Sequence, residues 1–144
     1  MTDTYLPAVI EEAQKAMTEG GVPIGSVLVL DGKIVGRGHN RQKQMNSIIR
    51  HAEIDCIDNA HGLTNADFRR TMIYTSLSPC EMCAGAIVFF KIPKVVIGEN
   101  HNYYGAEEYL RAQGVEVVVL NDAQCICMLQ EFDRNNPGAW NKGE

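Results

Sequence analysis

The sequence is short of the residues that bind nucleic acid or cross a membrane. It has 13 Lys and Arg against 18 Asp and Glu, so its formal net charge is −5 and its isoelectric point lies near 5.3. Binding to a long phosphate backbone depends on clustered cations, and the acidic balance therefore disfavours duplex or transfer RNA as a partner. Nor does the chain contain the run of about 18 apolar residues that a membrane-spanning helix requires.

The chain also lacks the signs of an exported protein. Its first residues, MTDTYLPAVIEEAQKAM, place acids within an amphipathic pattern and have no basic segment followed by an apolar run, so we expect no signal peptide. Cysteines number five, an odd count that favours free or metal-bound thiols in a reducing compartment over a disulfide framework. We therefore expect a cytoplasmic protein.

What is present is typical of one globular domain. Of the 144 residues, 45% are hydrophobic and 22% are charged, and no repeat, low-complexity segment or linker divides the chain. That length supplies enough core for the chain to fold without disulfides. We expect a single domain spanning residues 1–144.

Segments with helical and with alternating apolar spacing follow one another along the chain, separated by turn residues. Asp31 and Gly32 suit the type I′ turn of a hairpin. Helices are expected over residues 6–17, 51–61, 83–92, 107–114 and 122–133, and strands over 25–30, 33–40, 71–77, 94–98 and 115–120. A hairpin followed by alternating strands and helices predicts an α/β fold, a three-layer α/β/α sandwich around a mixed five-stranded sheet.

The segment SPCEMCAGA (78–86) places two cysteines at the start of a helix. Ser78 is a suitable N-cap, Pro79 suits the first helical position, and Glu81 would complete a capping box with Ser78. Cys80 and Cys83 then share one helix face, where the helix N-terminus lowers the pKa of a thiol. Taken alone, the pair is compatible with two half-buried thiols, a redox C-x-x-C or two metal ligands.

A third ligand and a proton-transfer group would distinguish a catalytic metal site from the other two interpretations. A catalytic zinc ion usually has three protein ligands and a water. His51 and Glu53, in the segment His51-Ala52-Glu53, supply a ligand and a carboxylate if both project from the first turn of a helix. In combination with P-C-x-x-C, which follows after 25 intervening residues, this is the zinc deaminase signature H-x-E…P-C-x-x-C.

On these motifs the chain resembles the cytidine and deoxycytidylate deaminase superfamily, and within it the fungal-type cytosine deaminases. The resemblance runs nearly end to end and also includes the late Trp140 and the segments EGGVPIG (19–25), GRGHN (36–40), TSLSPCEMCAGAI (75–87), KIPKVVIGENHNY (91–103) and EYLRAQGVEVVV (108–119).

The resemblance implies an enzyme of known type. His51, Cys80 and Cys83 would hold one catalytic Zn²⁺ per subunit, and Glu53 would carry protons between a water and the substrate. The reaction would be hydrolytic deamination of a free nucleobase, cytosine to uracil plus ammonia, in pyrimidine salvage. A homodimer is also implied, and the apolar segment AGAIVFFKI (84–92) agrees, because one sheet face cannot cover all sides of such a helix.

The same resemblance assigns residues to the substrate pocket. Asn40 would read the ring edge with its amide, although an Asn at the end of a strand is also a common turn residue. Ile24, Tyr103 and Trp140 would form apolar walls and a C-terminal lid, or could equally be core residues.

Two positions depart from the cytosine deaminase pattern. The carboxylate expected a few residues after the lid aromatic is present only as Glu144, which would bond the exocyclic amine in its place. Arg50, directly before His51, would either point into solvent or read an oxygen or anion on the substrate. These departures keep guanine, isocytosine and other amino-heterocycles as alternative substrates.

Two further functions remain open at this point. A tRNA adenosine deaminase shares the zinc motifs but would be expected to have a basic surface, and a non-catalytic zinc module would not need Glu53. Outside the motifs we expect packing roles for Cys56, Cys125 and Cys127, and structural or surface roles for His39, His61 and His101.

Overall fold

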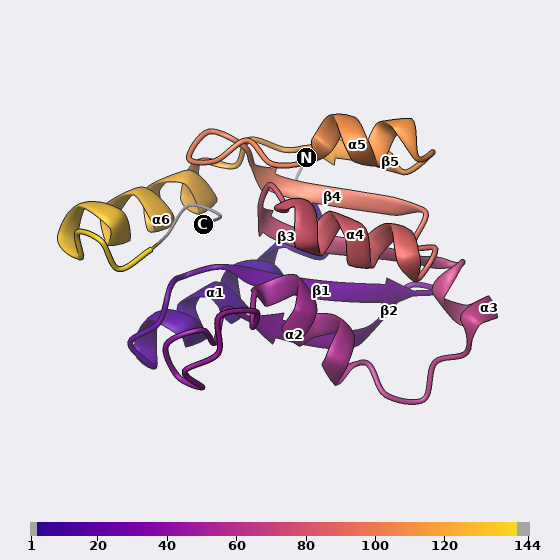
Figure 1. Ribbon diagram of the computed structural model, residues 1–144, viewed down its shortest axis with the longest axis horizontal. Helices are drawn as coiled ribbons and strands as arrows, with labels where there is room; N and C mark the ends of the chain where they lie inside the picture. Colours follow the sequence, from indigo (N-terminus) through magenta and orange to yellow (C-terminus); the bar gives the residue numbers. More distant parts are fainter. Residues whose placement is uncertain (1–2, 141–144) are drawn as a thin grey trace.

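A five-stranded sheet separates two layers of helices in the computed structural model, which describes residues 3–140 (Figure 1). The strand order is β2-β1-β3-β4-β5. In chain order the elements are α1 (Leu6–Thr18), β1 (Gly25–Leu30), β2 (Lys33–His39), α2 (Ala52–Asn59), α3 (Asn65–Phe68), β3 (Thr71–Leu77), α4 (Glu81–Phe89), β4 (Lys94–Glu99), α5 (Glu107–Ala112), β5 (Glu116–Val119) and α6 (Ala123–Asn135).

The sheet is mixed, as predicted. β1 is antiparallel to both β2 and β3, whereas β3, β4 and β5 are parallel to one another. The hairpin between β1 and β2 turns at Asp31 and Gly32, whose φ values of 50° and 81° are those that a type I′ turn requires.

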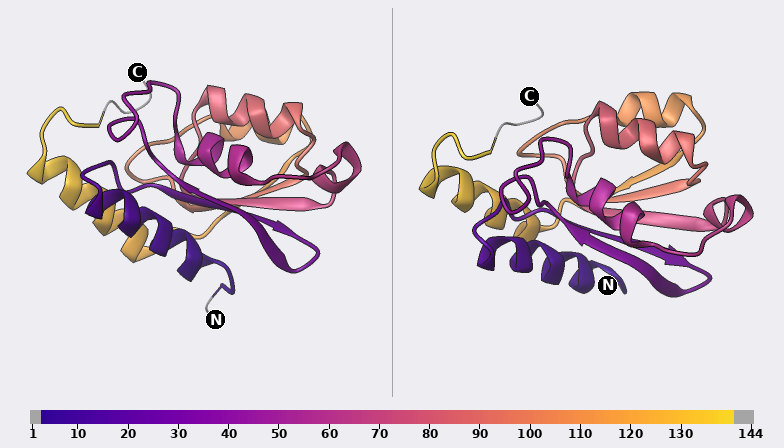
Figure 2. Two further views of the ribbon diagram at one scale, coloured as in Figure 1. Left: turned by 90° about the horizontal axis from the view of Figure 1, so that it is seen from below. Right: turned by 60° about the horizontal axis from the view of Figure 1, so that its bottom comes forward.

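Each face of the sheet is covered by its own helices. α1 and α6 lie on one face and α2, α4 and α5 on the other (Figure 2). Two apolar clusters fill the interfaces, one including Leu28, Ile73 and Ile97, the other including Val9, Val27 and Val96. Successive residues of β1 and β4 thus supply opposite faces, because side chains alternate along a strand. The three-layer α/β/α prediction is confirmed.

The close approach of α2 to the sheet depends on two glycines of β2. A Cβ atom at Gly38 would collide with the backbone of Cys56, and one at Gly36 would lie 2.8 Å from the Cys56 carbonyl oxygen. Because only glycine leaves this space, α2 packs directly on β2. The packing fixes the start of α2 against the end of β2.

The predicted start of α4 was wrong by about two residues. Cys80, not Ser78, is the N-cap of this helix. The Ser78 hydroxyl instead donates to Glu107 Oε2 at 2.6 Å and accepts from the Gly105 N–H at 2.9 Å. Because those partners engage its only hydroxyl, Ser78 does not cap the helix.

A capping box occurs elsewhere, at a short helix that the apolar pattern did not predict. Thr64 Oγ1 accepts from the Asp67 N–H at 3.1 Å, and the Asp67 carboxylate accepts from the Thr64 N–H at 2.9 Å. This T-x-x-D sequence begins α3, which is too short to show an apolar period.

Two further predictions were wrong in detail. α2 ends at Asn59, two residues before the predicted end at His61. Cys127, for which a packing role was expected, is exposed, whereas Cys56 and Cys125 are buried as expected. Within residues 3–140, no helix has both the length and the apolar character that crossing a membrane demands.

His39 has a structural role, at the centre of a network that joins α1 to the end of β2. Its buried ring lies between two carboxylates, with Nδ1 2.9 Å from Glu12 Oε1 and Nε2 2.9 Å from Glu19 Oε1. Glu12 also accepts from Arg37 Nε at 2.9 Å and from Lys15 Nζ at 3.1 Å. Burial acts to raise the pKa of Glu12, but these hydrogen bonds outweigh burial and lower it beneath its ordinary 4.5.

We predict that Glu12→Gln lowers the free energy of unfolding at pH 7 by about 2 kcal/mol, because cationic partners lose their carboxylate. A lowered folded-state pKa stabilises the fold above pH 4.5, and this contribution disappears as the pH falls through that lowered value. The gap between wild type and variant in urea unfolding should therefore narrow below pH 4.5. Glu11→Gln, at an exposed Arg37 contact, is the control and should change little. A gap that stays constant with pH would contradict the assignment.

Candidate active site

Two helix starts meet at one end of the sheet and bring the predicted metal ligands together. His51 is the N-cap of α2 and Cys80 the N-cap of α4, and Cys83 lies in the first turn of α4. His51 Nδ1 is 3.5 Å from Cys80 Sγ and 3.6 Å from Cys83 Sγ. The three ligand atoms all lie within 4.8 Å of one another, so they could hold one metal ion.

The two thiols of this group differ in acidity. A hydrogen bond from Cys83, with others from His51 and the Cys83 N–H, lowers the pKa of Cys80 to about 4. The shared hydrogen bond with Cys80, together with burial, raises the pKa of Cys83 well above its usual value. In turn, hydrogen bonding to Cys80 raises the pKa of His51. The pair thus carries one thiolate near neutral pH.

Glu53 lies beside these ligands. It belongs to the first turn of α2 and is only 4% exposed, among the metal-ligand side chains. Burial raises its pKa to about 7, because the carboxylate loses its hydration. A carboxyl with a pKa near neutrality can both accept and donate a proton at that pH.

A pocket opens directly above Glu53. Its empty space amounts to about 470 Å³ when the open mouth is included. Its lining residues are Ile24, Asn40, Gln42, His51, Ala52, Glu53, Leu77, Ser78, Cys80, Tyr103 and Trp140. All the predicted site residues within the described part of the chain therefore lie at one pocket, except Cys83, which lies behind Cys80 in α4.

Asn40 is buried at the end of β2, as predicted. It is 2% exposed, and its backbone N–H donates to the Ile24 carbonyl at 2.9 Å. That bond joins the amide residue to one of the pocket's apolar walls. Asn40 is thus a buried polar group held at the pocket by its backbone.

Ile24, Tyr103 and Trp140 belong both to the pocket wall and to an apolar cluster of the core. Ile24 and Trp140 are 7% and 9% exposed and pack in one cluster, with Tyr103 half-buried against it. All three also line the pocket. Glu144, the proposed substitute for the missing carboxylate, lies outside the described residues.

Both expectations for Arg50 were wrong. Its guanidinium donates to Asp55 Oδ1 at 2.8 Å and to Asp58 Oδ2 at 2.9 Å, and its side chain is only 20% exposed. It is not among the residues that line the pocket. Both partners follow in α2, so a sequence pattern of Arg before an acidic helix start could have indicated them.

Two residues of this region were not predicted. Gln42 lines the pocket two residues after Asn40, and Asp55, two residues after Glu53, is fully buried between Arg41 and Arg50. The only signal for Gln42 was its closeness in sequence to Asn40. Asp55 had a weak signal, an acid on the apolar side of a helix.

Comparison with known proteins agrees with the site. Residues 1–99 match the family model described as the cytidine and deoxycytidylate deaminase zinc-binding region. A cytosine deaminase of Candida albicans is 42% identical over 138 residues, 95% of this chain and 92% of that protein. A tRNA-specific adenosine deaminase of Bacillus subtilis is 42% identical over 142 residues, 92% of this chain and 88% of that protein.

The fold is likewise similar to a solved structure from studies of A-to-I editing by tRNA:A34 deaminases at the wobble position of transfer RNA. The TM-score is 0.75 at 30% sequence identity, over 87% of this chain and 98% of that one. Fold and metal site together define a zinc-dependent hydrolase. The chain belongs to the cytidine and deoxycytidylate deaminase family.

The residues present fit zinc. Two thiols and an imidazole nitrogen are the donors that this ion prefers, and three protein ligands leave the fourth position of a catalytic site open. Glu53 is a buried fourth polar group beside these ligands.

We predict that zinc binding to the metal-free protein at pH 7 releases at least one proton per ion. Cys80 and Cys83 must both be thiolates to bind zinc. Because its pKa is raised, Cys83 is protonated before zinc binds and must lose that proton on binding. Calorimetric titration in two buffers of different ionisation enthalpy measures the number of protons. Cys83→Ser should abolish tight binding. Equal heats in both buffers would contradict the assignment.

Proposed function

We propose that the chain is a cytosine deaminase, which converts free cytosine and water to uracil and ammonia. Residues 1–144 would form one catalytic domain acting in the cytoplasm in pyrimidine salvage. The observation that carries this proposal is the placement of Glu53, with a pKa of about 7, beside His51 and Cys80 in the pocket that Asn40 also lines.

The chain's own residues divide the chemistry. Zinc, when bound by His51, Cys80 and Cys83, would supply Lewis acidity that makes a water nucleophilic at neutral pH. Glu53 takes a proton from that water and delivers it to the ring nitrogen N3. The water oxygen attacks C4, and Glu53 then transfers the second proton to the amine, which leaves as ammonia.

Asn40 and the apolar walls orient the ring. An amide offers one donor and one acceptor group, so it can pair with the ring edge far from the amine. Ile24, Tyr103 and Trp140 supply flat or apolar surface on which a ring packs while water is excluded.

The charges around the pocket favour an uncharged substrate. Among the described residues that line it, none is Lys or Arg. The nearby cations Arg41 and Arg50 are paired with the buried Asp55. A substrate phosphate would find no cationic partner there, so a free base or nucleoside fits better than a nucleotide.

Transfer RNA is the main competing substrate, because the tRNA-specific adenosine deaminase of Bacillus subtilis matches at the same 42% identity as the cytosine deaminase does. The net charge of −5 supports a small substrate instead. Guanine and isocytosine were kept as alternatives because of Arg50 and of the late carboxylate Glu144. Since Arg50 is paired with Asp55 and Asp58, it no longer supports those substrates. A non-catalytic module is disfavoured by the buried carboxyl of Glu53.

We predict that zinc-loaded protein releases ammonia from cytosine faster than from 5-methylcytosine, isocytosine, guanine, adenine, cytidine or a tRNA anticodon stem. Glu53→Gln should lower kcat by at least about 100-fold, because proton transfer is lost, and should keep zinc at one ion per chain. A coupled ammonia assay and metal analysis measure the two quantities. Faster turnover of another base would show that this base, and not cytosine, is the substrate. Full activity of Glu53→Gln would refute the mechanism.

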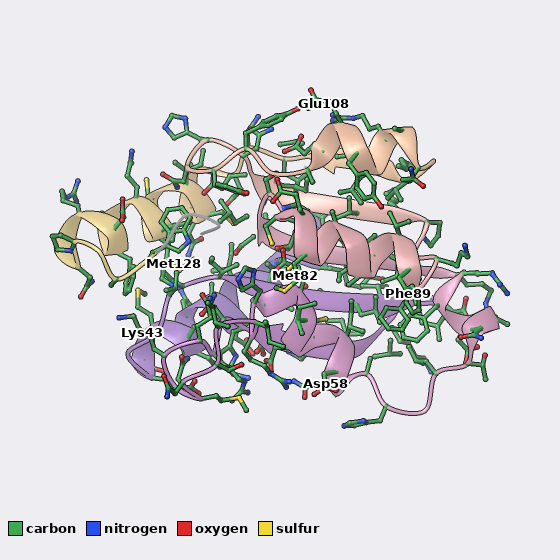
Figure 3. All side chains as sticks on the ribbon, in the orientation of Figure 1. Lys43, Asp58, Met82, Phe89, Glu108 and Met128 are labelled. Carbon is green, nitrogen blue, oxygen red and sulfur yellow. The ribbon has the colours of Figure 1, made fainter. Side chains whose placement is uncertain are left out.

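We also propose a homodimer formed through the face that carries α2 and α4. Phe89, at the end of α4, is 76% exposed, and Met82, at its start, is 38% exposed (Figure 3). Ile48, in the loop before α2, is 76% exposed. Apolar side chains this exposed on one layer are typical of a surface that a partner covers.

Phe89→Lys should weaken self-association at least about tenfold, because it places a charge in the apolar interface. Sedimentation at micromolar concentration should show a dimer for wild type and a shift toward monomer for the variant. Met17→Lys, on the opposite helix layer and 42% exposed, is the matched control. A wild-type protein that is only monomeric would refute the proposal.

A further inference from the structure

Gln42 holds both ends of the Asn40 side-chain amide. Asn40 Nδ2 donates to Gln42 Oε1 at 3.0 Å, and Asn40 Oδ1 accepts from the Gln42 backbone N–H at 3.1 Å. A backbone N–H can only donate, so it determines which end of the Asn40 amide is oxygen. The opposite orientation would set two N–H groups against each other.

The Gln42 side chain is itself fixed. Its Nε2 donates to the Ile48 carbonyl at 2.7 Å, and a carbonyl can only accept. Gln42 Oε1 must therefore face Asn40. Two backbone groups, one at each end of this chain of hydrogen bonds, thus fix the orientation of both amides.

The loop that carries Gln42 is closed at its base. The Arg41 N–H donates to the Arg50 carbonyl at 2.9 Å. The buried Asp55 carboxylate accepts hydrogen bonds from the guanidinium groups of Arg41 and Arg50. It also accepts from the His39 N–H at 3.0 Å. Gln42 therefore projects from an anchored loop. Its side chain bonds Asn40 at one end and, at the other end, the carbonyl of Ile48 in the segment before His51.

We propose that Gln42 is the positioning residue that sets the donor and acceptor order of Asn40 toward the substrate. The inference rests on the proposed function, because it assigns Asn40 to the base edge. After its bonds to Gln42, Asn40 keeps one N–H and one oxygen lone pair for a ligand. These match a ring edge with a carbonyl oxygen next to an N–H, such as O2 and N1–H of cytosine. Cytidine lacks that N–H, so free bases are favoured over nucleosides.

Gln42→Met removes both side-chain hydrogen bonds while keeping the length of the side chain. The edge contact is made in ground state and transition state alike, so KM for the base that wild type deaminates best should rise about 3- to 10-fold at unchanged kcat. Gln42→Glu still accepts from Asn40 and should show a smaller rise. Lys43→Met alters an exposed neighbour in the same loop, labelled in Figure 3, and should behave as wild type.

A double-mutant cycle separates positioning from a general structural effect. In the Asn40→Ala background, Gln42→Met should raise KM no further, because the residue through which it acts is gone. Independent, additive effects on KM would overturn the proposal. So would a fall in kcat with KM unchanged.

A readout without turnover makes the test independent of the substrate. The side-chain amide protons of Asn40, assigned by their loss in Asn40→Ala, should exchange with water faster in Gln42→Met than in wild type or Lys43→Met. Equal exchange rates would overturn the positioning role. If wild type deaminates no base, the proposed function fails, and proton exchange alone decides whether Gln42 holds the Asn40 amide.

Discussion

The active site depends on the buried carboxylate of Asp55. With no exposed surface, it accepts hydrogen bonds from the His39 N–H and from Arg41 and Arg50. These three residues immediately flank Asn40 and His51, so one carboxylate joins the segment that carries the pocket amide Asn40 to the segment that carries the predicted metal ligand His51. Removing one member of such a group leaves charges buried without partners, which is far more costly than losing an exposed ion pair. The placement of Asn40 at the same pocket as His51 therefore depends on Asp55 as much as on β2.

A second buried carboxylate holds the other half of the site. Glu107, 1% exposed at the start of α5, accepts from the Ser78 hydroxyl at 2.6 Å, and the same hydroxyl accepts from the Gly105 N–H. The Ala106 N–H donates to the Pro79 carbonyl at 2.9 Å. The residues directly before Cys80 are thus tied to a segment about 30 positions later. The start of α2, which carries His51, and the start of α4, which carries Cys80, are thus each anchored by a buried carboxylate, Asp55 for α2 and Glu107 for α4.

The difference between what the sequence predicted and what it did not follows the range of the contacts. The Asp31-Gly32 turn, the strand and helix order and the zinc motifs depend on residues within a few positions of one another, and these predictions held. Ser78 was assigned to a local cap because S-x-x-E is a local pattern, yet its partner Glu107 lies 29 residues away. The role proposed for Gln42 was missed for a related reason: its bonds to Asn40 are local, but their importance depends on Asn40 and Glu53 lining one pocket, which only the folded sheet brings about.

The distribution of charge around the pocket bears on the pKa of Glu53, and so on the two roles, base and acid, that are proposed for this carboxyl. The nearby guanidinium groups are held by Asp55 and Asp58, and among the described lining residues His51 is the cation whose charge lowers the pKa of Glu53. Burial then dominates and raises the pKa of Glu53 to about 7. A group with an ordinary glutamate pKa would accept a proton from water poorly, and a group with a much higher pKa would not release it to the departing amine. Pairing the arginines with aspartates of α2, rather than directing them to the pocket, therefore leaves Glu53 with the near-neutral pKa that the proposed reaction requires.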